Sequence, residues 1–391
     1  MSSSLDNIYL TPEHELLREQ VARFIAREVE PHAQAWEEQG FTPRDVLRKM
    51  GEAGLLGLMY AAEHGGAEAD ALTNLVFAEA LSQSTYAGFI ITVLVHTDMA
   101  SPHLHHAGSA AQKATYMPGV TAGRTITAVG ITEPGAGSDV AGIRTTARRD
   151  GDEYVINGSK TFITNGARAD FILLVTKTDP DAGHDGVTLF IVDLKDDDGN
   201  NVPGFTVTRT LEKMGMHASD TAELSFKDVR VPAENILGQE GKGFYHISWE
   251  LQGERLVAAA GSVAGAERLF EKTLEYAKDR QAFGRPIGRF QNTRFELAEM
   301  HTEVTIAETY LEKAILEHNA GRFTAEDAAM AKWWTTELQK KVVDRCLQLH
   351  GGYGYMLEYP VARAFLDTRI KTIYGGTTEI MKEIIGRSLG V

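Results

Sequence analysis

The first third of the chain repeats apolar residues at three- and four-residue steps, which is the period of an amphipathic helix. The first of these runs begins after Thr11-Pro12. Threonine caps helices and proline favours the first helical position, so we expect a helix from here to about Pro31. Further helices are expected at roughly 43–54, 70–84 and 88–107.

From about Thr125 the apolar period changes to two, the period of a strand with one buried face. Asn157-Gly158 lies between two alternating runs, and this dipeptide is the strongest short signal of a β-hairpin. Several more short runs follow without a helix between them, which is typical of an antiparallel sandwich or barrel. Residues 127–236 are therefore expected to form a β-domain inserted between helical domains at 1–126 and 237–391.

After Gly243 the helical period returns in three long stripes, which begin near Leu256, Leu297 and Met330. Long helices with apolar seams are typical of an antiparallel bundle. The expected fold class is therefore α+β and multidomain. It combines an all-α N-terminal domain, an antiparallel β-barrel-like middle domain and a C-terminal helical bundle.

Composition narrows the classes of partner. The chain has 391 residues, enough for two or three packed units, and a formal net charge of -15. No dense Lys/Arg tract is present to neutralise phosphates, so we expect no nucleic-acid partner. An acidic surface would still allow a basic protein to dock.

The cysteine and histidine residues indicate no metal site. The single cysteine, Cys346, excludes an internal disulfide and a Cys-rich zinc site, and it falls on an apolar helical face where we expect a core side chain. His103, His105 and His106 are adjacent histidines without partner carboxylates or cysteines. We therefore expect surface or capping groups and no bound metal.

The sequence also predicts a soluble protein without membrane insertion. The start, Met1–Asp6, lacks the basic and apolar regions of a signal peptide. No apolar run approaches the ~20 residues of a membrane span. Together with the single cysteine, these features indicate a reducing compartment, a bacterial-type cytoplasm.

The run Gly135–Val140 superficially imitates the glycine fingerprint of dinucleotide-binding folds. The imitation fails because Val140 stands at the third glycine position and a strand follows where the fingerprint requires a helix. What remains is a flexible turn whose backbone N–H groups can converge on an anionic or carbonyl oxygen.

Three longer strings carry a family resemblance. They are Ile131–Asp139 (ITEPGAGSD), Gln348–Gly354 (QLHGGYG) and Ile373–Ile380 (IYGGTTEI), and together they resemble the acyl-CoA dehydrogenases. The resemblance spans nearly the whole chain and is densest from 125 to 391. In the tail it is nearest to the long-chain and isovaleryl-type branch of the family.

The resemblance implies an FAD-dependent enzyme that removes the α-proton of an acyl-CoA, transfers the β-hydride to flavin N5 and releases a trans-2-enoyl-CoA. It also implies the family's fold, in which the C-terminal bundle has four helices, and assembly as a homotetramer. The implied electron acceptor is an electron-transferring flavoprotein. The length and branching of the acyl chain do not follow from these motifs.

The resemblance also implies a set of FAD contacts. Thr132 would bond to the isoalloxazine edge, Phe162 would pack beside the ring, and Thr164 would donate toward N5. Taken alone, Phe162 would instead be interpreted as a core residue on a sheet face. The full set of implied FAD contacts is Ile131, Thr132, Gly137, Ser138, Phe162, Thr164, Arg280, Phe283, Gln291, Gln348, Gly352, Thr377 and Glu379.

Part of this set would reach the FAD of a neighbouring subunit, which implies an obligate oligomer. Arg280 and Gln291 would contact the pyrophosphate and the adenosine, with Phe283 alongside. The segment Gln348–Gly352 would contact the same FAD. A guanidinium suits this role because its planar fork matches phosphate oxygens bidentately.

The catalytic base is identified by a displaced glutamate. Most of the family carries its glutamate where this chain has Gly375. The long-chain and isovaleryl-type branch instead places it on the helix after the β-domain, immediately before an arginine. Glu254-Arg255 matches that pattern, so the resemblance implies that Glu254 is the base, while the backbone N–H of Gly375 could still donate to the thioester oxygen. The implied substrate contacts are Ser138, Arg255, Gly375 and Gly376.

Helical spacing places Glu254, Ala258, Gly261 and Gly265 on one face. The small residues can be interpreted as room for a ligand beside the carboxylate. Alternatively, Glu254 is an acid favoured by the helix dipole, and the small residues allow close helix packing. The coincidence with Gly375 favours the catalytic interpretation.

Two other classes of function remain open from the sequence. The same fold hosts flavin-dependent monooxygenases and nitroalkane-oxidising enzymes, which use the FAD site with a different base. A non-catalytic flavin-binding scaffold is the other alternative.

Overall fold

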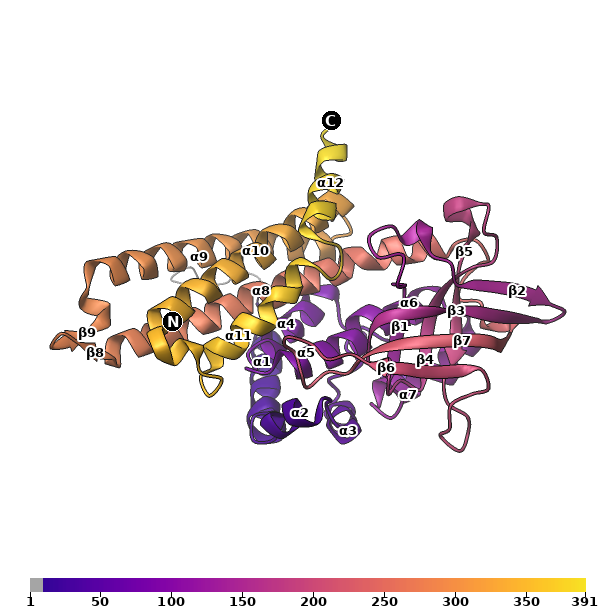
Figure 1. Ribbon diagram of the computed structural model, residues 1–391, viewed down its shortest axis with the longest axis horizontal. Helices are drawn as coiled ribbons and strands as arrows, with labels where there is room; N and C mark the ends of the chain where they lie inside the picture. Colours follow the sequence, from indigo (N-terminus) through magenta and orange to yellow (C-terminus); the bar gives the residue numbers. More distant parts are fainter. Residues whose placement is uncertain (1–9) are drawn as a thin grey trace. The chain divides into compact units, whose positions relative to one another are not determined.

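The computed structural model describes residues 10–391, so the expectation for Met1–Asp6 lies outside the described residues. The chain forms two compact units. One unit contains residues 10–31 together with Asp70–Ala87 and Glu254–Val391, and the other contains His32–Ala69 and Gly88–Gly253. Figure 1 shows the order of the elements along the chain.

Helices dominate the chain before residue 127, as the three- and four-residue period predicts. Thr11 has an extended backbone immediately before Pro12, which occupies the first helical position. The helices are α1 (Pro12–Phe24), α2 (Ala33–Gln39), α3 (Arg44–Glu52), α4 (Ala71–Leu81), α5 (Ala87–Leu94), α6 (Ser101–Ala107) and α7 (Ala110–Thr121). Short π-helical segments, Ile25–Val29 and Val95–Ala100, extend α1 and join α5 to α6.

The middle of the chain forms one curled seven-stranded sheet. Its strands follow the order β1-β4-β2-β3-β7-β6, with β5 paired to β4. The pairings of β4 with β1 and with β2 are parallel, and the other pairings in this sheet are antiparallel. The strands are β1 (Thr127–Gly130), β2 (Thr146–Asp150), β3 (Glu153–Thr164), β4 (Phe171–Lys177), β5 (Val187–Asp193), β6 (Phe205–Thr210) and β7 (Thr221–Pro232).

The sheet is buried on both faces around β4, because alternate side chains of a strand point to opposite faces. Ile172 and Leu174 join the core between β3, β5 and β7. Leu173 and Val175 join a second core, which includes Met117 of α7. This explains why β4 reads as a continuous apolar run instead of an alternating one.

The predicted hairpin at Asn157-Gly158 is wrong, because β3 runs straight through both residues. The asparagine side chain instead bonds across to Asp228 on β7, at an irregularity in the β3–β7 register. The glycine is needed for a close approach: a Cβ at position 158 would lie 2.7 Å from the Cα of Thr145. The turn into β3 lies earlier, at Gly151, which has φ +71°.

The C-terminal part forms the predicted helical bundle. Cys346 is fully buried there, as expected, and its thiol lies 3.9 Å from the Leu269 carbonyl of the neighbouring helix. The helices are α8 (Gly243–Asp279), α9 (Gln291–Asn319), α10 (Ala325–His350), α11 (Pro360–Thr368) and α12 (Thr378–Ser388). A two-stranded ribbon of β8 (Gln281–Ala282) and β9 (Arg285–Pro286) joins α8 to α9.

Candidate active site

The predicted base and the turn before α12 meet in the first unit. Glu254 lies on α8, and Gly375 lies in the turn with φ +63°. A Cβ built on Gly375 would lie 3.1 Å from Oε1 of Glu254. The structure therefore brings together two positions that are 121 residues apart in the sequence. The glutamate carboxylate lies in close contact with the position where a side chain of residue 375 would begin.

Burial raises the pKa of Glu254 above its usual value. The positive charges of Arg255 and Lys332 act in the opposite direction. The same enclosure raises the pKa of Tyr374, with a further contribution from the Glu254 carboxylate. The carboxyl group is thus placed to exchange a proton closer to neutral pH than an exposed glutamate would.

Two buried cations hold the turn beside Glu254. Arg255 Nε donates to the Gly375 carbonyl at 3.2 Å, and Lys332 Nζ donates to the Gly376 carbonyl at 2.6 Å. Gly375 and Gly376 have φ angles of +63° and +99°, which side-chain-bearing residues rarely adopt. The sequence did not single out Lys332. Its signal is its spacing of four from Ala328, on the buried face of small residues of α10.

Thr377 and Glu379 begin α12. Thr377 is the N-cap, and its hydroxyl accepts the backbone N–H of Ile380 at 3.3 Å. Glu379 lies exposed in the first turn, where the backbone and Thr377 lower the pKa of its carboxyl group. Both residues therefore fix the helix start next to the glycine turn.

The small-residue strip beyond Glu254 is filled by protein. A Cβ at Gly261 would lie 2.9 Å from the hydroxyl of Ser82, and one at Gly265 would lie 2.4 Å from Nε2 of Gln339. The interpretation of these two glycines as ligand space is wrong, because α4 and α10 approach α8 there. Close helix packing, the alternative left open by the sequence, explains them.

The second unit brings together two segments with residues that the resemblance assigns to FAD binding, one around Thr132 and the other around Phe162. Thr161 N–H donates to the Thr132 carbonyl at 2.9 Å, and Lys160 Nζ donates to the Ile131 carbonyl at 3.0 Å. Lys160 is fully buried and pairs with Glu133 at 2.8 Å. Neither Lys160 nor Glu133 was predicted from the sequence, because a buried charge pair has no periodic signal.

Phe162 is exposed, so its interpretation as a sheet-face core residue is wrong. Its side chain is 68% exposed and its φ is +60°, at an irregularity in the β3–β7 pairing. A bulky residue with positive φ is strained, and such strain is frequent at functional sites. Thr164 follows, partly buried and paired with Thr221.

The glycine-rich turn after β1 presents open backbone. Gly137 and Ser138 are exposed, and a Cβ at Gly137 would meet no atom within 4 Å. Asp139 closes the turn by accepting the backbone N–H of Gly142 at 3.1 Å. The turn therefore leaves room for a ligand to approach the main chain.

A third group of predicted FAD contacts lies at the far end of the bundle, and all of its members are exposed. The Arg280 guanidinium lies over the Tyr353 ring, 5.2 Å from its centroid, and Phe283 is 96% exposed. Arg280 follows Glu254 by 26 positions, about 39 Å along a helix. Glu254 and Arg280 therefore cannot touch one small ligand in a single chain. This group comprises Arg280, Phe283, Gln291, Gln348 and Gly352.

The expectation that the histidine cluster lies at the surface is wrong for His103, which is buried in the first turn of α6. Burial lowers the pKa of this histidine to about 3, so it is neutral. Among residues 10–391, no group of three or more His, Cys, Asp or Glu side chains is arranged to hold a metal ion. Within the same range, no helix has the length and apolar character needed to cross a membrane.

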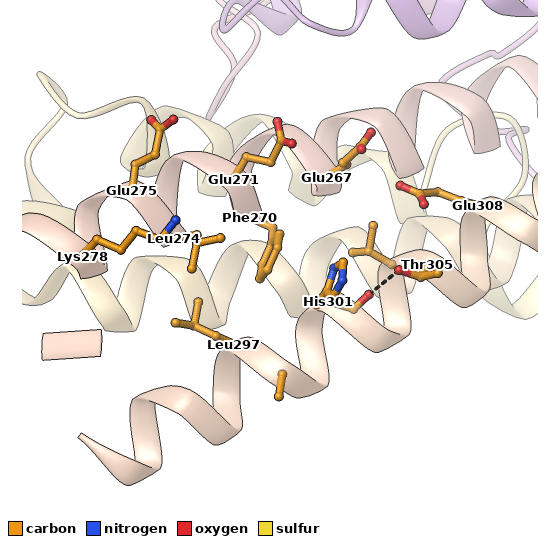
Figure 2. Close-up of a pocket in the computed structure, with 12 residues that line it drawn as sticks. Glu267, Phe270, Glu271, Leu274, Glu275, Lys278, Leu297, His301, Thr305 and Glu308 are labelled. Atoms are coloured by element: carbon orange, nitrogen blue, oxygen red, sulfur yellow. Dashed lines mark hydrogen bonds between the residues drawn. The ribbon is translucent and has the colours of Figure 1, made fainter. Parts of the chain in front are cut away.

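A groove of about 390 Å³ lies between α8 and α9 (Figure 2). Its first lining residue on α8, Glu267, follows Glu254 by 13 positions. Its floor is apolar, and Phe270 stacks on His301 with ring centroids 5.6 Å apart. Burial and the neighbouring carboxylates of Glu267, Glu312 and Glu79 raise the pKa of Glu308 to about 8. No predicted site residue lines this groove. Its acidic lining residues are Glu267, Glu271, Glu275 and Glu308.

Removing the buried charge of Lys160 should destabilise the second unit. Lys160→Met leaves the Glu133 carboxylate buried without its cation, which costs about 3–5 kcal/mol of unfolding free energy. Denaturant unfolding followed by tryptophan fluorescence measures this loss. The double variant Lys160→Met/Glu133→Gln should recover part of it, and an unchanged midpoint in the single variant would contradict the structure of the pair.

Glu308→Gln should stabilise the protein in a pH-dependent way. A raised carboxyl pKa means that the folded protein binds this proton more tightly than the unfolded chain. Below the ordinary carboxyl pKa, Glu308 therefore does not reduce the free energy of unfolding. Above it, the reduction grows as the pH rises to about 8. The variant should melt a few degrees higher than wild type at pH 8 and at the same temperature at pH 4. The exposed neighbour Glu275→Gln should show no such dependence.

Comparison with known proteins agrees with the sequence resemblance and confirms the expected fold class. Models of the N-terminal, middle and C-terminal domains of acyl-CoA dehydrogenases match residues 11–124, 128–229 and 241–390. The mitochondrial long-chain specific acyl-CoA dehydrogenase of Mus musculus is 43% identical over 382 residues, which cover 96% of this chain and 86% of that protein.

Solved structures give the same result. An acyl-CoA dehydrogenase from Geobacillus kaustophilus superposes with a TM-score of 0.93 at 44% identity, covering 98% of this chain and 100% of the other. The FAD complex of PigA superposes with a TM-score of 0.92 at 30% identity, covering 97% and 98%. The chain belongs to the acyl-CoA dehydrogenase family.

Proposed function

We propose that the protein is an FAD-dependent acyl-CoA dehydrogenase that converts an acyl-CoA to its trans-2-enoyl-CoA, with Glu254 as the catalytic base. The observation that carries the proposal is the position of the Glu254 carboxylate, 3.1 Å from the site of a Cβ on Gly375. A carboxylate is therefore available at this turn although the turn itself has no side chain. The relatives named as acyl-CoA dehydrogenases support the reaction class.

The residues of the second unit fit a flavin. Thr132 and Thr164 are partly buried hydroxyl residues, and Thr132 bonds through its carbonyl to Thr161, next to the exposed Phe162. The turn at Gly137 and Ser138 leaves its backbone open. An exposed aromatic ring with adjacent donors suits a planar heterocycle whose edge forms hydrogen bonds. When bound, FAD supplies the acceptor for the substrate's β-hydride. Ile131, Thr132, Gly137, Ser138, Phe162 and Thr164 of this unit would hold it, and the sequence resemblance alone assigns further FAD contacts to Thr377 and Glu379.

The residues of the first unit would act on the thioester. Glu254 would take the α-proton, and the backbone N–H of Gly375 would donate to the thioester oxygen as negative charge develops there. Arg255 bonds to the Gly375 carbonyl at 3.2 Å, so it restrains the peptide that follows the one carrying this N–H. Arg255, Gly375 and Gly376, together with Ser138, form the proposed substrate contacts.

The charge state of Glu254 sets the expected pH dependence. The base must be ionised to take a proton, and burial raises the pKa of this carboxyl group. Flavin reduction should therefore lose rate as the pH falls through this raised value, at a higher pH than an exposed glutamate would give.

The distal group of FAD contacts supports assembly. Arg280 and Phe283 lie beyond the C-terminal end of α8, too far from Glu254 to serve the same FAD, so we assign them to the FAD of a neighbouring subunit. Gln291, Gln348 and Gly352 belong to the same group. This arrangement is met by the proposed homotetramer, in which each site is incomplete without its neighbour.

The proposed electron acceptor, location and domain boundaries rest on the sequence. An electron-transferring flavoprotein is the proposed electron acceptor, and the net charge of -15 suits a basic partner surface. A bacterial-type cytoplasm is proposed as the location, because the single cysteine is typical of a reducing compartment. The proposed domain boundaries are those at 126/127 and 236/237.

Glu254→Gln should retain FAD and lose flavin reduction. The amide keeps the size of the side chain but cannot take a proton, and a general base contributes about 10²–10⁴ in rate. Anaerobic mixing with acyl-CoAs of different length and branching, followed by flavin absorbance, measures the rate and ranks the substrates by kcat/KM.

Glu275→Gln, an exposed glutamate on the same helix, serves as the matched control and should reduce at the wild-type rate. A Glu254→Gln variant that reduces normally would exclude this base. Rapid oxygen consumption with a hydroxylated product would instead identify a monooxygenase, and no response of the wild type to any thioester would identify a scaffold.

A further inference from the structure

Lys332 is a fully buried lysine on α10 whose ammonium group contacts the glycine turn. Its side chain has no exposed surface, and Nζ donates to the Gly376 carbonyl at 2.6 Å. A buried ammonium is costly unless it is paired or bonded, so its presence at this turn requires a compensating role. All the groups involved belong to the first unit.

The charges facing Lys332 come from three helices. Burial lowers the pKa of Lys332 to about 8, and the positive charge of Arg255 on α8 acts in the same direction. The carboxylates of Glu254 on α8, Glu337 on α10 and Glu379 on α12 raise it. The ammonium group is therefore charged at neutral pH, and Glu254 contributes most among the carboxylates that raise its pKa.

The two glycines need hydrogen bonds from residues outside the turn to keep it in one conformation. Gly375 and Gly376 have positive φ angles and no side chains, so the turn has more conformational freedom than any other sequence would give it. Arg255 restrains the carbonyl of the first glycine, and Lys332 restrains that of the second. Bonds from charged donors are roughly twice as strong as neutral ones, so the pair can fix the turn without any side chain within it.

We propose that Lys332 is a positioning residue for the dehydrogenase reaction, which holds the Gly375–Gly376 turn against Glu254 and supplies positive charge to the carboxylate. The proposal rests on the proposed function, in which the Gly375 N–H donates to the thioester oxygen. Lys332 acts through the turn and through Glu254 and does not itself touch the substrate. Its two effects, on geometry and on charge, are separable by experiment.

The geometric effect is measured without any reaction. In the FAD-bound protein, Lys332→Met should speed amide hydrogen exchange in residues 373–380 by about tenfold or more, because a hydrogen bond from a charged group is worth at least such a factor. Exchange in the neighbouring turns of α10 should stay unchanged. Lys341→Met is the matched control, because this exposed lysine of α10 pairs with Glu303 at the surface. The control should exchange like the wild type.

The electrostatic effect is measured by the pH profile of flavin reduction. Lys332→Met removes a cation that lowers the pKa of Glu254, so the acid limb of the profile should move to higher pH. The rate at the optimum should fall by about tenfold to a hundredfold, as small misplacements of catalytic groups do. KM should change less than kcat, because the turn would act on the developing charge. Lys341→Met should leave profile and rate unchanged.

A charge-retaining variant separates positioning from general destabilisation. Lys332→Arg should keep the acid limb at the wild-type pH, whereas Lys332→Gln should move it upward as Lys332→Met does. This pair replaces the methionine variant if that variant does not fold. The proposal would be overturned if hydrogen exchange in residues 373–380 did not change in the variant. It would also be overturned if Lys332→Arg and Lys332→Gln had acid limbs at the same pH. If no thioester reduces the flavin of the wild type, the proposed function fails. The hydrogen-exchange comparison still decides whether Lys332 holds the turn.

Discussion

The structure depends on one close approach, between a carboxylate on a helix and a turn that has no side chains. Glu254 can face this turn because Gly375 leaves its Cβ position empty, 3.1 Å from Oε1. Positive φ angles at Gly375 and Gly376 allow the chain to bend back over α8 at this point. A side chain at residue 375 would be strained by its φ and would compete with the Glu254 carboxylate for space.

This approach concentrates charge in a partly enclosed place, where Glu254 is half-buried and Arg255 and Lys332 are buried. Burial raises the pKa of Glu254 and lowers those of Arg255 and Lys332, so each charged form is unfavourable alone. Together they offset one another, since opposite charges attract strongly where the dielectric is low. Buried ionic groups often contribute little net stability compared with apolar packing. Their presence here is better explained by the proton that Glu254 is proposed to move.

Much of the fold was predictable because it follows from periodicity. The helical period after Gly243 and the alternating period after Thr125 gave the helical and strand regions, and Cys346 is buried as its apolar face predicts. Local signals failed where tertiary contacts decided the outcome. Asn157-Gly158 does not form a hairpin, because its side chain bonds to β7 and its glycine lies against Thr145.

The candidate site was only partly predictable for the same reason. Motifs located Glu254 and Gly375, and the structure brings them together. Lys160 and Lys332 bond to the carbonyls of the candidate site residues Ile131 and Gly376. Both lysines are buried, and nothing in the apolar period of their segments distinguishes a buried charged residue from a buried apolar one. Phe162, taken alone in the sequence, is likewise interpreted as a core residue. In the structure it has a positive φ at a bulge, and its side chain is exposed. Pairings between distant residues set these positions, and a single sequence does not record them.

The central claim is that Glu254 removes the α-proton of a thioester. A crystal structure of the FAD-bound protein with an unreactive acyl-CoA analogue tests this claim most directly. A carboxylate oxygen of Glu254 should lie about 3–3.5 Å from the α-carbon, with the Gly375 N–H on the thioester oxygen. The claim would be contradicted if the α-carbon faced a different base, or if the Glu254 carboxylate pointed away from the ligand.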